Sequence, residues 1–513
     1  MFTVTKTQSV LSAIGIGALL LCVGCSSGPS TAIPPPAPVT LTIGYPHITG
    51  VDPLHGLQQA ARLISFEGLA SLGRDGRPQP RLAERWSVSD DGLRWSVHLR
   101  PNAYFHDGTP VNSEAVRQSL ERSLGNADRD LSPGLADIIR IESRGPLDII
   151  LHLRERSTFA LDDLTVSIVK INAEGAQSGT GPFFVTGSSD NQITMNGMDR
   201  YYRGKPSIDH IVWKAYPAVR TAWAAMMRGE VDFLYEVGPE AVEFMRGEST
   251  VNVFPFLRSY MFGVIFNSKI GKFRDWRVRR ALNDAVEREA IVEQALRGHG
   301  VIASGPAWPQ HWAFDGTVPE IAYDPSRATA LLNAAGLPVR PTATGPASRF
   351  RFTCILPENF ALWERIGLMV QRNLAEVGVD MRLEAVSVDE FNRRIGTGSF
   401  DAVLNEFVVG NNTSRPFTFW YSQSRRNLWG YKNSEMDAAF DSMRQAASET
   451  DYRMAFRRFQ NEGLDDPPAI FLVLGERARA VTKRFNVVAQ PGTDILHTIA
   501  DWRPAVSDSR LSN

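Results

Sequence analysis

Cysteine is scarce in this sequence. Among its 513 residues only Cys22, Cys25 and Cys354 are cysteines. Because the first two lie close to the N-terminus, the body of the chain has a single thiol, which excludes an intrachain disulfide and a cysteine-based metal cluster there. Cys354 lies in the stretch Arg351-Phe352-Thr353-Cys354-Ile355-Leu356. Its alternation is typical of a strand, and we expect the thiol to be buried as a small apolar group.

The sequence also lacks an excess of charge of either sign and, beyond its N-terminal segment, any long apolar run. A net charge of -1 provides no attraction of the whole molecule to nucleic acid or to an anionic membrane, so we expect no nucleic-acid partner. No internal stretch approaches the ~18 apolar residues of a transmembrane helix. With 43% apolar and 22% charged residues, the composition is that of a globular protein long enough for more than one domain.

Recognisable catalytic motifs are absent as well. The chain has no Gly-x-Ser-x-Gly, His-Glu-x-x-His, Gly-x-x-x-x-Gly-Lys or Gly-x-Gly-x-x-Gly motif. Its nine histidines are scattered, and no two have the spacing that a helical metal site requires. We therefore expect no metal, no cofactor and no enzymatic activity. A secreted hydrolase whose catalytic group is assembled from distant residues remains an alternative.

The N-terminal segment has the features of an export signal. An apolar run over residues 10–23 is shorter than the ~20 residues that span a bilayer and fits a secretory signal. It ends at Leu21-Cys22-Val23-Gly24-Cys25, which resembles a bacterial lipobox with cysteine where that motif usually has leucine. We expect residues 1–24 to be a signal peptide, Cys25 to carry a lipid, and residues 25–37 to be a flexible tether. A plain signal peptide or an uncleaved anchor remains an alternative.

Periodicity predicts helices and strands in the body of the chain. Two alternating stretches separated by Asp90-Asp91-Gly92 predict a hairpin, and residues 113–124, capped by Asn112 or Ser113, predict a helix. Apolar spacing further predicts a helix over 60–72 and the longest helix of the chain over 275–296. Strand–helix–strand steps within residues 350–386 indicate α/β layering.

Short motifs in a fixed order suggest a family. They include Leu82-Ala83-Glu84-Arg85-Trp86, Phe105-His106-Asp107-Gly108-Thr109-Pro110-Val111, Gly179-Thr180-Gly181-Pro182, Tyr201-Tyr202-Arg203-Gly204-Lys205-Pro206, Arg277-Val278-Arg279-Arg280-Ala281-Leu282-Asn283 and Trp429-Gly430-Tyr431. Together they resemble solute-binding protein family 5, the extracytoplasmic receptors for dipeptides, oligopeptides, nickel complexes and related solutes. The resemblance extends from about residue 41 to residue 490.

The resemblance implies an α/β, two-lobed periplasmic-binding-protein fold of type II, with an extra domain and a two-strand hinge. Lobe I would combine residues 38–76, 179–257 and 481–503, residues 77–178 would form the extra domain, and residues 258–480 would form lobe II. A peptide or other small solute would bind between the lobes, and the hinge would close on it. The expected partners are an ABC permease and its ATPase, with the receptor a monomer held at the membrane by its lipid. A receptor of this fold that signals or acts as a chaperone without a transporter remains an alternative.

The expected binding site departs from the peptide-binding pattern of the family. In peptide-binding members the stretch similar to Phe407-Val408-Val409-Gly410-Asn411 reads Trp-x-x-Asp, and its aspartate binds the ammonium group of the peptide, but this chain has Gly410 in the place of that aspartate. Loss of that carboxylate removes a charge-assisted bond of about 1.5–3 kcal/mol. Either the ligand has no ammonium at this point or another acid binds it. The candidate ligand-binding residues are Tyr45, His47, Asn267, Glu406, Phe407, Asn411, Asn412, Trp429 and Tyr431.

Overall fold

A computed structural model describes residues 37–46, 53–125, 132–341 and 346–505. The chain divides into two compact units, residues 1–38 and 39–513, and the fold set out below is that of the second unit. The predicted signal peptide, nearly all of the predicted tether, Cys25 and His47 lie outside the described residues. Among the helices that are described, none is at once long enough and apolar enough to cross a membrane.

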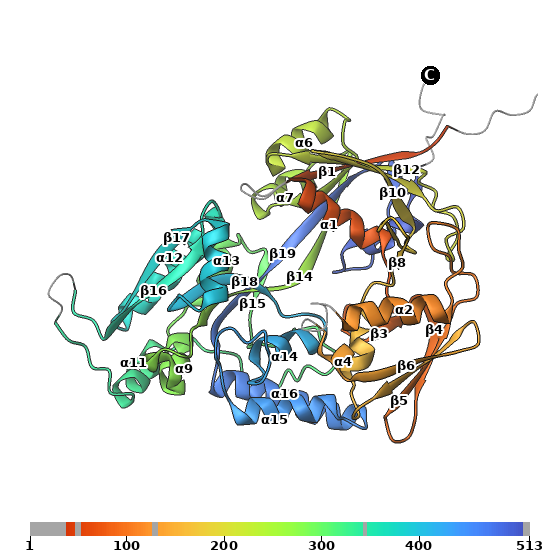
Figure 1. The fold of residues 1–513 in the computed structure, drawn as a ribbon. Coiled ribbons are helices and arrows are strands. Elements are labelled where there is room, and N and C mark those ends of the chain that lie inside the picture. Colours follow the sequence, from red (N-terminus) through yellow and green to blue (C-terminus); the bar gives the residue numbers. More distant parts are fainter. Residues whose placement is uncertain (1–36, 47–52, 126–131, 342–345, 506–513) are drawn as a thin grey trace, which may run out of the picture. The chain divides into compact units, whose positions relative to one another are not determined.

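A mixed sheet of eleven strands forms the centre of the second unit (Figure 1). Its order is β10-β11-β12-β1-β13-β19-β14-β18-β16-β17, and β15 pairs with β19 beside this path. The strands are β1 (Thr40–Pro46), β10 (Phe183–Ser189), β11 (Gln192–Gly197), β12 (His210–Tyr216), β13 (Phe233–Val237), β14 (Val251–Phe266), β15 (Gly300–Ile302), β16 (Phe350–Pro357), β17 (Val379–Val386), β18 (Ala402–Val408) and β19 (Ala469–Thr482).

The two long strands β14 and β19 connect the halves of this sheet. They pair with each other from Val251↔Thr482 to Ile265↔Ala469, and the register shifts between Leu257 and Met261. On one side of this irregularity β19 pairs with β13, and on the other side β14 pairs with β18. A bulge bends a strand and increases its local twist. Both long strands therefore pass from one half of the sheet to the other at the same level, which is the geometry of a two-strand hinge.

Apolar residues cover both faces of the sheet in the half that contains β16, β17 and β18. In β18, Val403 and Phe407 belong to one apolar cluster, whereas Ala402 and Leu404 belong to the cluster on the opposite face. A strand buried on both faces is typical of α/β layering. Cys354 of β16 is fully buried, as predicted, and burial raises the pKa of its thiol to about 12.

Helices pack on both halves of the sheet. On the first half they are α1 (Pro53–Ser65), α6 (Val219–Met227), α7 (Pro239–Arg246) and the 3-10 helix η3 (Ile495–Asp501). On the second half they are α8 (Gly271–Arg274), α9 (Trp276–Asp284), α10 (Arg288–Ala290), α11 (Pro325–Ala334), α12 (Ala361–Glu376), α13 (Val388–Thr397), α14 (Ser414–Trp420), α15 (Ser434–Arg444) and α16 (Glu449–Asp465).

A second, four-stranded sheet has the order β4-β5-β7-β6. Its strands are β4 (Ala83–Val88), β5 (Arg94–Leu99), β6 (Ile138–Arg144) and β7 (Asp148–Leu153), and α2 (Ser113–Leu124), α4 (Pro133–Ala136), α5 (Phe159–Asp162) and the 3-10 helix η1 (Asp163–Thr165) lie in the same region. The predicted hairpin at Asp90-Asp91-Gly92 is confirmed, since β4 and β5 pair antiparallel. The predicted helix over 113–124 is also confirmed, and the Asn112 side chain accepts a 2.9 Å bond from the Ala115 N–H at its start.

Three short two-stranded sheets complete the fold. They are β2 (Ala70–Leu72) with β3 (Pro78–Pro80), β8 (Lys170–Ile171) with β9 (Gln177–Ser178), and β20 (Phe485–Asn486) with β21 (Arg503–Pro504).

The four-stranded domain contacts the helices that pack on the second half of the large sheet. Asp137 and Arg444 form an ion pair in which Arg444 Nε donates to Asp137 Oδ2 at 3.0 Å. The Thr158 N–H donates to the Arg444 carbonyl at 2.8 Å. Phe159 is fully buried, and its ring centroid lies 5.5 Å from that of Phe417. Charge, backbone and apolar contacts thus join these two parts.

Two helix predictions are wrong. The predicted helix over 275–296 ends as α9 at Asp284 and continues as α10 and a π-helical turn, Ile291–Ala295. The cause is Arg288, whose fully buried guanidinium donates to the carbonyls of Asn283, Val286 and Phe471. In a straight helix the carbonyls of Asn283 and Val286 would instead accept from backbone N–H groups four residues further on.

The predicted helix over 60–72 is shifted toward the N-terminus. Helix α1 covers Pro53–Ser65, and residues 70–72 form β2 instead. The buried face of α1 consists of Leu57, Ala60, Ala61 and Ile64, whereas Leu63, which the periodicity had included, is 54% exposed.

Candidate functional site

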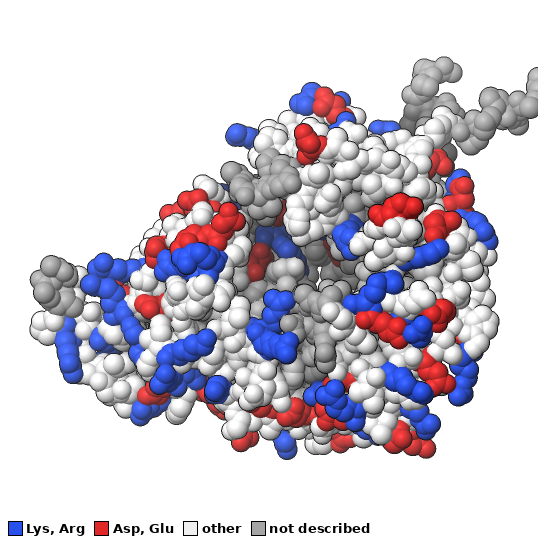
Figure 2. Space-filling model, viewed as in Figure 1, with Lys and Arg blue, Asp and Glu red and all other residues white. Residues whose placement is uncertain are grey.

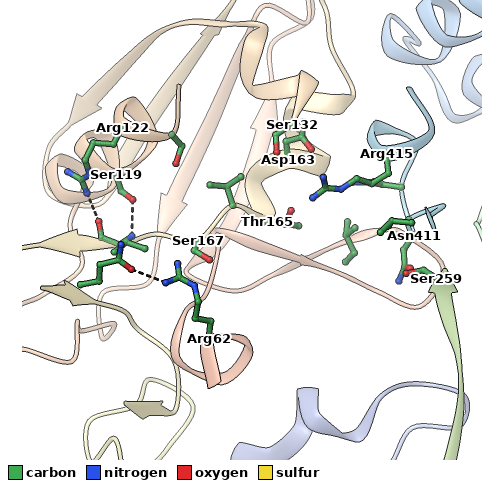
Figure 3. Close-up of a pocket in the computed structure, with 18 of the residues that line it drawn as sticks. Arg62, Ser119, Arg122, Ser132, Asp163, Thr165, Ser167, Ser259, Asn411 and Arg415 are labelled. Carbon is green, nitrogen blue, oxygen red and sulfur yellow. Dashed lines mark hydrogen bonds between the residues drawn. The ribbon is translucent and has the colours of Figure 1, made fainter. Parts of the chain in front are cut away.

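A cavity of about 570 Å³ lies where the hinge, the four-stranded domain and both halves of the sheet meet (Figure 3). Ser259 of β14 and Val408 of β18 line it beside the loop that leads to α14. Across from these, η1 and helices α1 and α2 supply further walls. The charged and amide side chains of the lining are Arg62, Arg122, Asp163, Gln177, Asn411, Asn412 and Arg415.

Gly410 allows the loop before α14 to adopt its conformation. Its φ angle is +70°, in the left-handed region that favours glycine. A Cβ atom at this position would lie 3.0 Å from both Cβ and Cγ of Arg415. The backbone N–H of Val409 donates to the Ser259 carbonyl at 3.0 Å, which ties the loop to the hinge strand. Any side chain here, aspartate included, would be strained and would displace the stem of Arg415.

Arg415 extends from α14 into the cavity toward Asp163 and Thr165 (Figure 3). It is partly exposed, and within the part of the chain that the structure describes its guanidinium makes no hydrogen bond and no ion pair. By contrast, Arg62 donates to the Gln177 side chain at 3.0 Å, and Arg122 donates to the Val169 carbonyl. Arg62 and Arg122 each use one N–H donor in these bonds, whereas Arg415 keeps all of its guanidinium donors available among the described residues.

Asp163 is the carboxyl group that the described lining contains. Its side chain is buried and accepts a 2.6 Å bond from the Gly134 N–H. Burial raises its pKa to about 7, even though that N–H and the charge of Arg415 act in the opposite direction. Near neutral pH this carboxyl is thus ionised in only part of the molecules, and the lining as described carries a net positive charge.

A second cavity of about 770 Å³ adjoins the first and shares Leu72, Thr165 and Asn411 with it. The Asn411 amide donates to the Gly73 carbonyl at 3.3 Å at this junction. Deeper in the second cavity, Glu67 accepts hydrogen bonds from the hydroxyls of Tyr201 and Tyr202 at 2.8 and 3.1 Å. Burial raises the pKa of Glu67.

Charged groups also gather on the hinge strands. Glu406 accepts a 3.2 Å bond from Arg477 and lies 3.9 Å from Arg258, so its charge is already balanced by two arginines. Figure 2 shows a hollow in the face of the molecule that Figure 1 also presents, and acidic and basic side chains lie at the walls of this hollow. On the other side of the hinge, the Tyr45 ring lies 5.1 Å from the ring of Tyr235, and burial raises the pKa of Tyr45.

The remaining predicted residues lie apart from the cavity lining. Phe407, Trp429 and Tyr431 are buried in one apolar cluster, and the Tyr431 hydroxyl donates to the Asp466 carbonyl at 2.8 Å. The Trp429 indole N–H is buried without a partner among the described residues. The Asn267 amide donates to the carbonyls of Gly398 and Phe400 at 3.2 and 2.8 Å, and these bonds stabilise the loop over residues 398–400. Of the predicted set, the structure brings Asn411 and Asn412 together in the cavity, next to Gly410.

Sequence reasoning missed Arg415, Asp163 and Ser259. Arg415 comes five positions after Gly410. The sequence alone therefore places a cation close to the position at which peptide-binding members have a carboxylate. Asp163 and Ser259 reach the cavity from the four-stranded domain and from the bulge of β14, and no sequence pattern marked either one. No group of three or more metal-binding side chains occurs among residues with a described position.

Comparisons with known proteins agree with this architecture. The family of bacterial extracellular solute-binding proteins, family 5 (middle region), matches residues 77–429. A probable D,D-dipeptide-binding periplasmic protein of Escherichia coli is 25% identical over 422 residues, which cover 76% of this chain and 78% of that protein.

Two solved structures share the fold. The oligopeptide-binding protein AppA of Bacillus subtilis, in complex with a nonapeptide, has a TM-score of 0.76 at 20% identity and covers 91% of this chain and 99% of its own. NikZ of Campylobacter jejuni, in complex with Ni(L-His), has a TM-score of 0.77 at 20% identity and covers 90% and 99%. These likenesses confirm the predicted α/β periplasmic-binding-protein fold. The chain therefore belongs to the bacterial extracellular solute-binding proteins of family 5, and it is an extracytoplasmic receptor of the ABC-importer type and not an enzyme.

Proposed function

We propose that this receptor encloses a small solute or peptide in the cavity beside Arg415 and hands it to an ABC permease and its ATPase. The observation that carries the proposal is the origin of the lining. Arg62 and Leu72 come from elements of one half, Val408 and Arg415 from the other, and Ser259 from the hinge strand between them. A solute that contacts all of them favours the closed arrangement over the open one.

The proposed lobes follow from the same hinge. Residues 38–76, 179–257 and 481–503 form lobe I, residues 77–178 form the extra domain, and residues 258–480 form lobe II. In support, the bulge of β14 lies between Leu257 and Met261, and β19 extends to Thr482. Both proposed lobe boundaries therefore fall within the two long strands.

The solute itself is not set by the fold. AppA was solved with a nonapeptide and NikZ with a nickel–histidine complex, and both share this architecture. We place the residues that distinguish solutes in the lining of the cavity, namely Asn411, Asn412 and Arg415.

Filling the cavity tests the binding site. The side chain of Val408 lines the cavity and is partly exposed, so Val408→Trp places an indole in its space. Native mass spectrometry of the purified protein is expected to show a co-purifying solute with the unmodified chain and none with Val408→Trp. The matched control is Val301→Trp on the short strand β15, where Val301 is 40% exposed. Retention of the solute by Val408→Trp would place the binding site elsewhere.

We further propose that Cys25 carries a lipid that holds the receptor at the membrane. The support is the lipobox-like segment Leu21-Cys22-Val23-Gly24-Cys25. Cys25→Ser is expected to move the protein from the membrane fraction to the soluble fraction, with loss of an acyl mass on the mature N-terminus, whereas Cys22→Ser leaves both unchanged. An N-terminal peptide of the unmodified protein that carries no acyl mass would exclude the lipid anchor.

A further inference from the structure

We propose that the cavity binds an anionic solute, which presents a carboxylate or another oxyanion to Arg415 and no free ammonium group at that point. This inference rests on the proposed function, because it names the chemical class of the solute that the same cavity takes.

The state of the Arg415 guanidinium favours an anionic partner. It points into the cavity and makes no hydrogen bond or ion pair with any described residue. A guanidinium carries its donors in a planar fork that matches the two oxygens of a carboxylate or phosphate. An unpaired cation in a cavity from which closure removes water is costly unless the ligand supplies the opposite charge.

The stem of Arg415 lies close against the loop before α14. Because Gly410 has no side chain, its Cα packs directly against the stem of Arg415, where an added Cβ would lie 3.0 Å from two of its carbons. The loop is held in turn by the bond from the Val409 N–H to Ser259. A side chain at position 410, an acidic one included, would thus be strained and would crowd the stem of Arg415.

The surroundings of the guanidinium favour an oxyanion over an ammonium group. The Asn412 side chain is buried, lines the cavity and makes no hydrogen bond within the described ranges, so its amide is available to an oxyanion. Asp163 is the acid that faces Arg415, and its burial disfavours a permanent negative charge there. An ammonium group would meet a cation and a partly protonated acid, whereas an oxyanion would meet donors.

Small oxyanions test the site without knowledge of the whole solute. Thermal unfolding is measured with sodium acetate and with inorganic phosphate against sodium chloride at constant ionic strength. The proteins are the unmodified chain, Arg415→Ala, Arg415→Lys and the control Arg365→Ala on the exposed face of α12. We expect a saturable rise in the unfolding midpoint for the unmodified chain and the control. The apparent affinity should fall about ten- to hundredfold in Arg415→Ala, and less in Arg415→Lys, which retains a charge but not the fork.

A cationic probe separates this inference from the proposed function. Alanyl-alanine amide has an ammonium and no carboxylate, and N-acetyl-alanyl-alanine has the reverse. If the amide binds, and binding is lost in Val408→Trp but unchanged in Arg415→Ala, the cavity is the binding site and the anionic class is wrong. An equal oxyanion response in Arg415→Ala, or no saturable response to acetate and phosphate at all, also overturns the inference. If, in addition, Val408→Trp retains its co-purifying solute, the proposed function fails with it.

Discussion

At Asp163, a carboxyl group is buried beside a cation that does not bond to it. Its folded-state pKa is raised to about 7 chiefly by burial, against an ordinary value of 3.8. Between these two values the folded protein holds a proton that the unfolded chain has released. The stabilising contribution of this proton is therefore complete below about pH 4 and is lost as the pH rises toward 7.

The substitution Asp163→Asn removes this dependence. The amide oxygen can still accept from the Gly134 N–H, but it never becomes charged. At pH 8 we expect the free energy of unfolding of Asp163→Asn to exceed that of the unmodified chain by roughly 1–4 kcal/mol, and at pH 4.5 the two should be nearly equal. Urea unfolding at both pH values measures the difference. Asp190→Asn, at an exposed position, is the control, and an equal gain at both pH values would contradict the assignment.

Residues of the cavity lining were predictable from the sequence only where a neighbouring motif marked them. Asn411 and Asn412 were found because they follow the position at which peptide-binding members have an acid, and both line the cavity. Trp429 and Tyr431 belong to another motif of the family, yet their side chains are buried in the same apolar cluster as Phe407. The direction of a side chain depends on the turn that precedes it. For the residues from Asn411 to Arg415 that turn is at Gly410, which has a positive φ.

At the scale of the element, local patterns placed the hairpin at Asp90-Asp91-Gly92 and helix α2, whereas a long-range hydrogen bond accompanies the failure of the helix predicted over 275–296. Helix α2 has the predicted bounds because its cap, Asn112, is local. The predicted helix over 275–296 failed because Arg288 bonds to the carbonyl of Phe471, 183 residues away in sequence. No window of local sequence contains that partner. The full length of the long strands β14 and β19 likewise depends on distant partners, since each pairs with the other from Val251↔Thr482 to Ile265↔Ala469.

Arg288→Met tests this account of the broken helix. Methionine fills a similar volume but leaves the buried carbonyls of Asn283, Val286 and Phe471 without their donor. An unsatisfied buried group costs about 1–3 kcal/mol, so we expect a loss of at least about 3 kcal/mol in the free energy of unfolding, measured in urea. Arg365→Met, on the exposed face of α12, should cause little change. A loss no larger than that of the control would show that Arg288 does not hold the break.

At the scale of the whole second unit, the family fold was readable because its motifs occur in order over most of the chain. The attachment of the four-stranded domain was not, because it depends on single side chains that meet across distant segments. Asp137 and Arg444 are 307 residues apart in sequence, and Phe159 joins the apolar cluster of the opposite part. Such pairs leave no periodic trace in either segment.

The attachment makes a prediction about cooperativity between these two parts. The Asp137 side chain is 4% exposed and its partner Arg444 is 18% exposed, so removal of the arginine leaves a buried carboxylate unpaired. Arg444→Met should lower the free energy of unfolding by about 3 kcal/mol, and the second change Asp137→Leu should restore most of it, because the cost lies in the unpaired charge and not in the lost pair. Calorimetry of both variants measures this, and it also shows whether the four-stranded domain of Arg444→Met unfolds in a separate transition at lower temperature. A double variant as unstable as the single one would mean that Phe159 and the Thr158 backbone contact, rather than the ion pair, hold the domain in place.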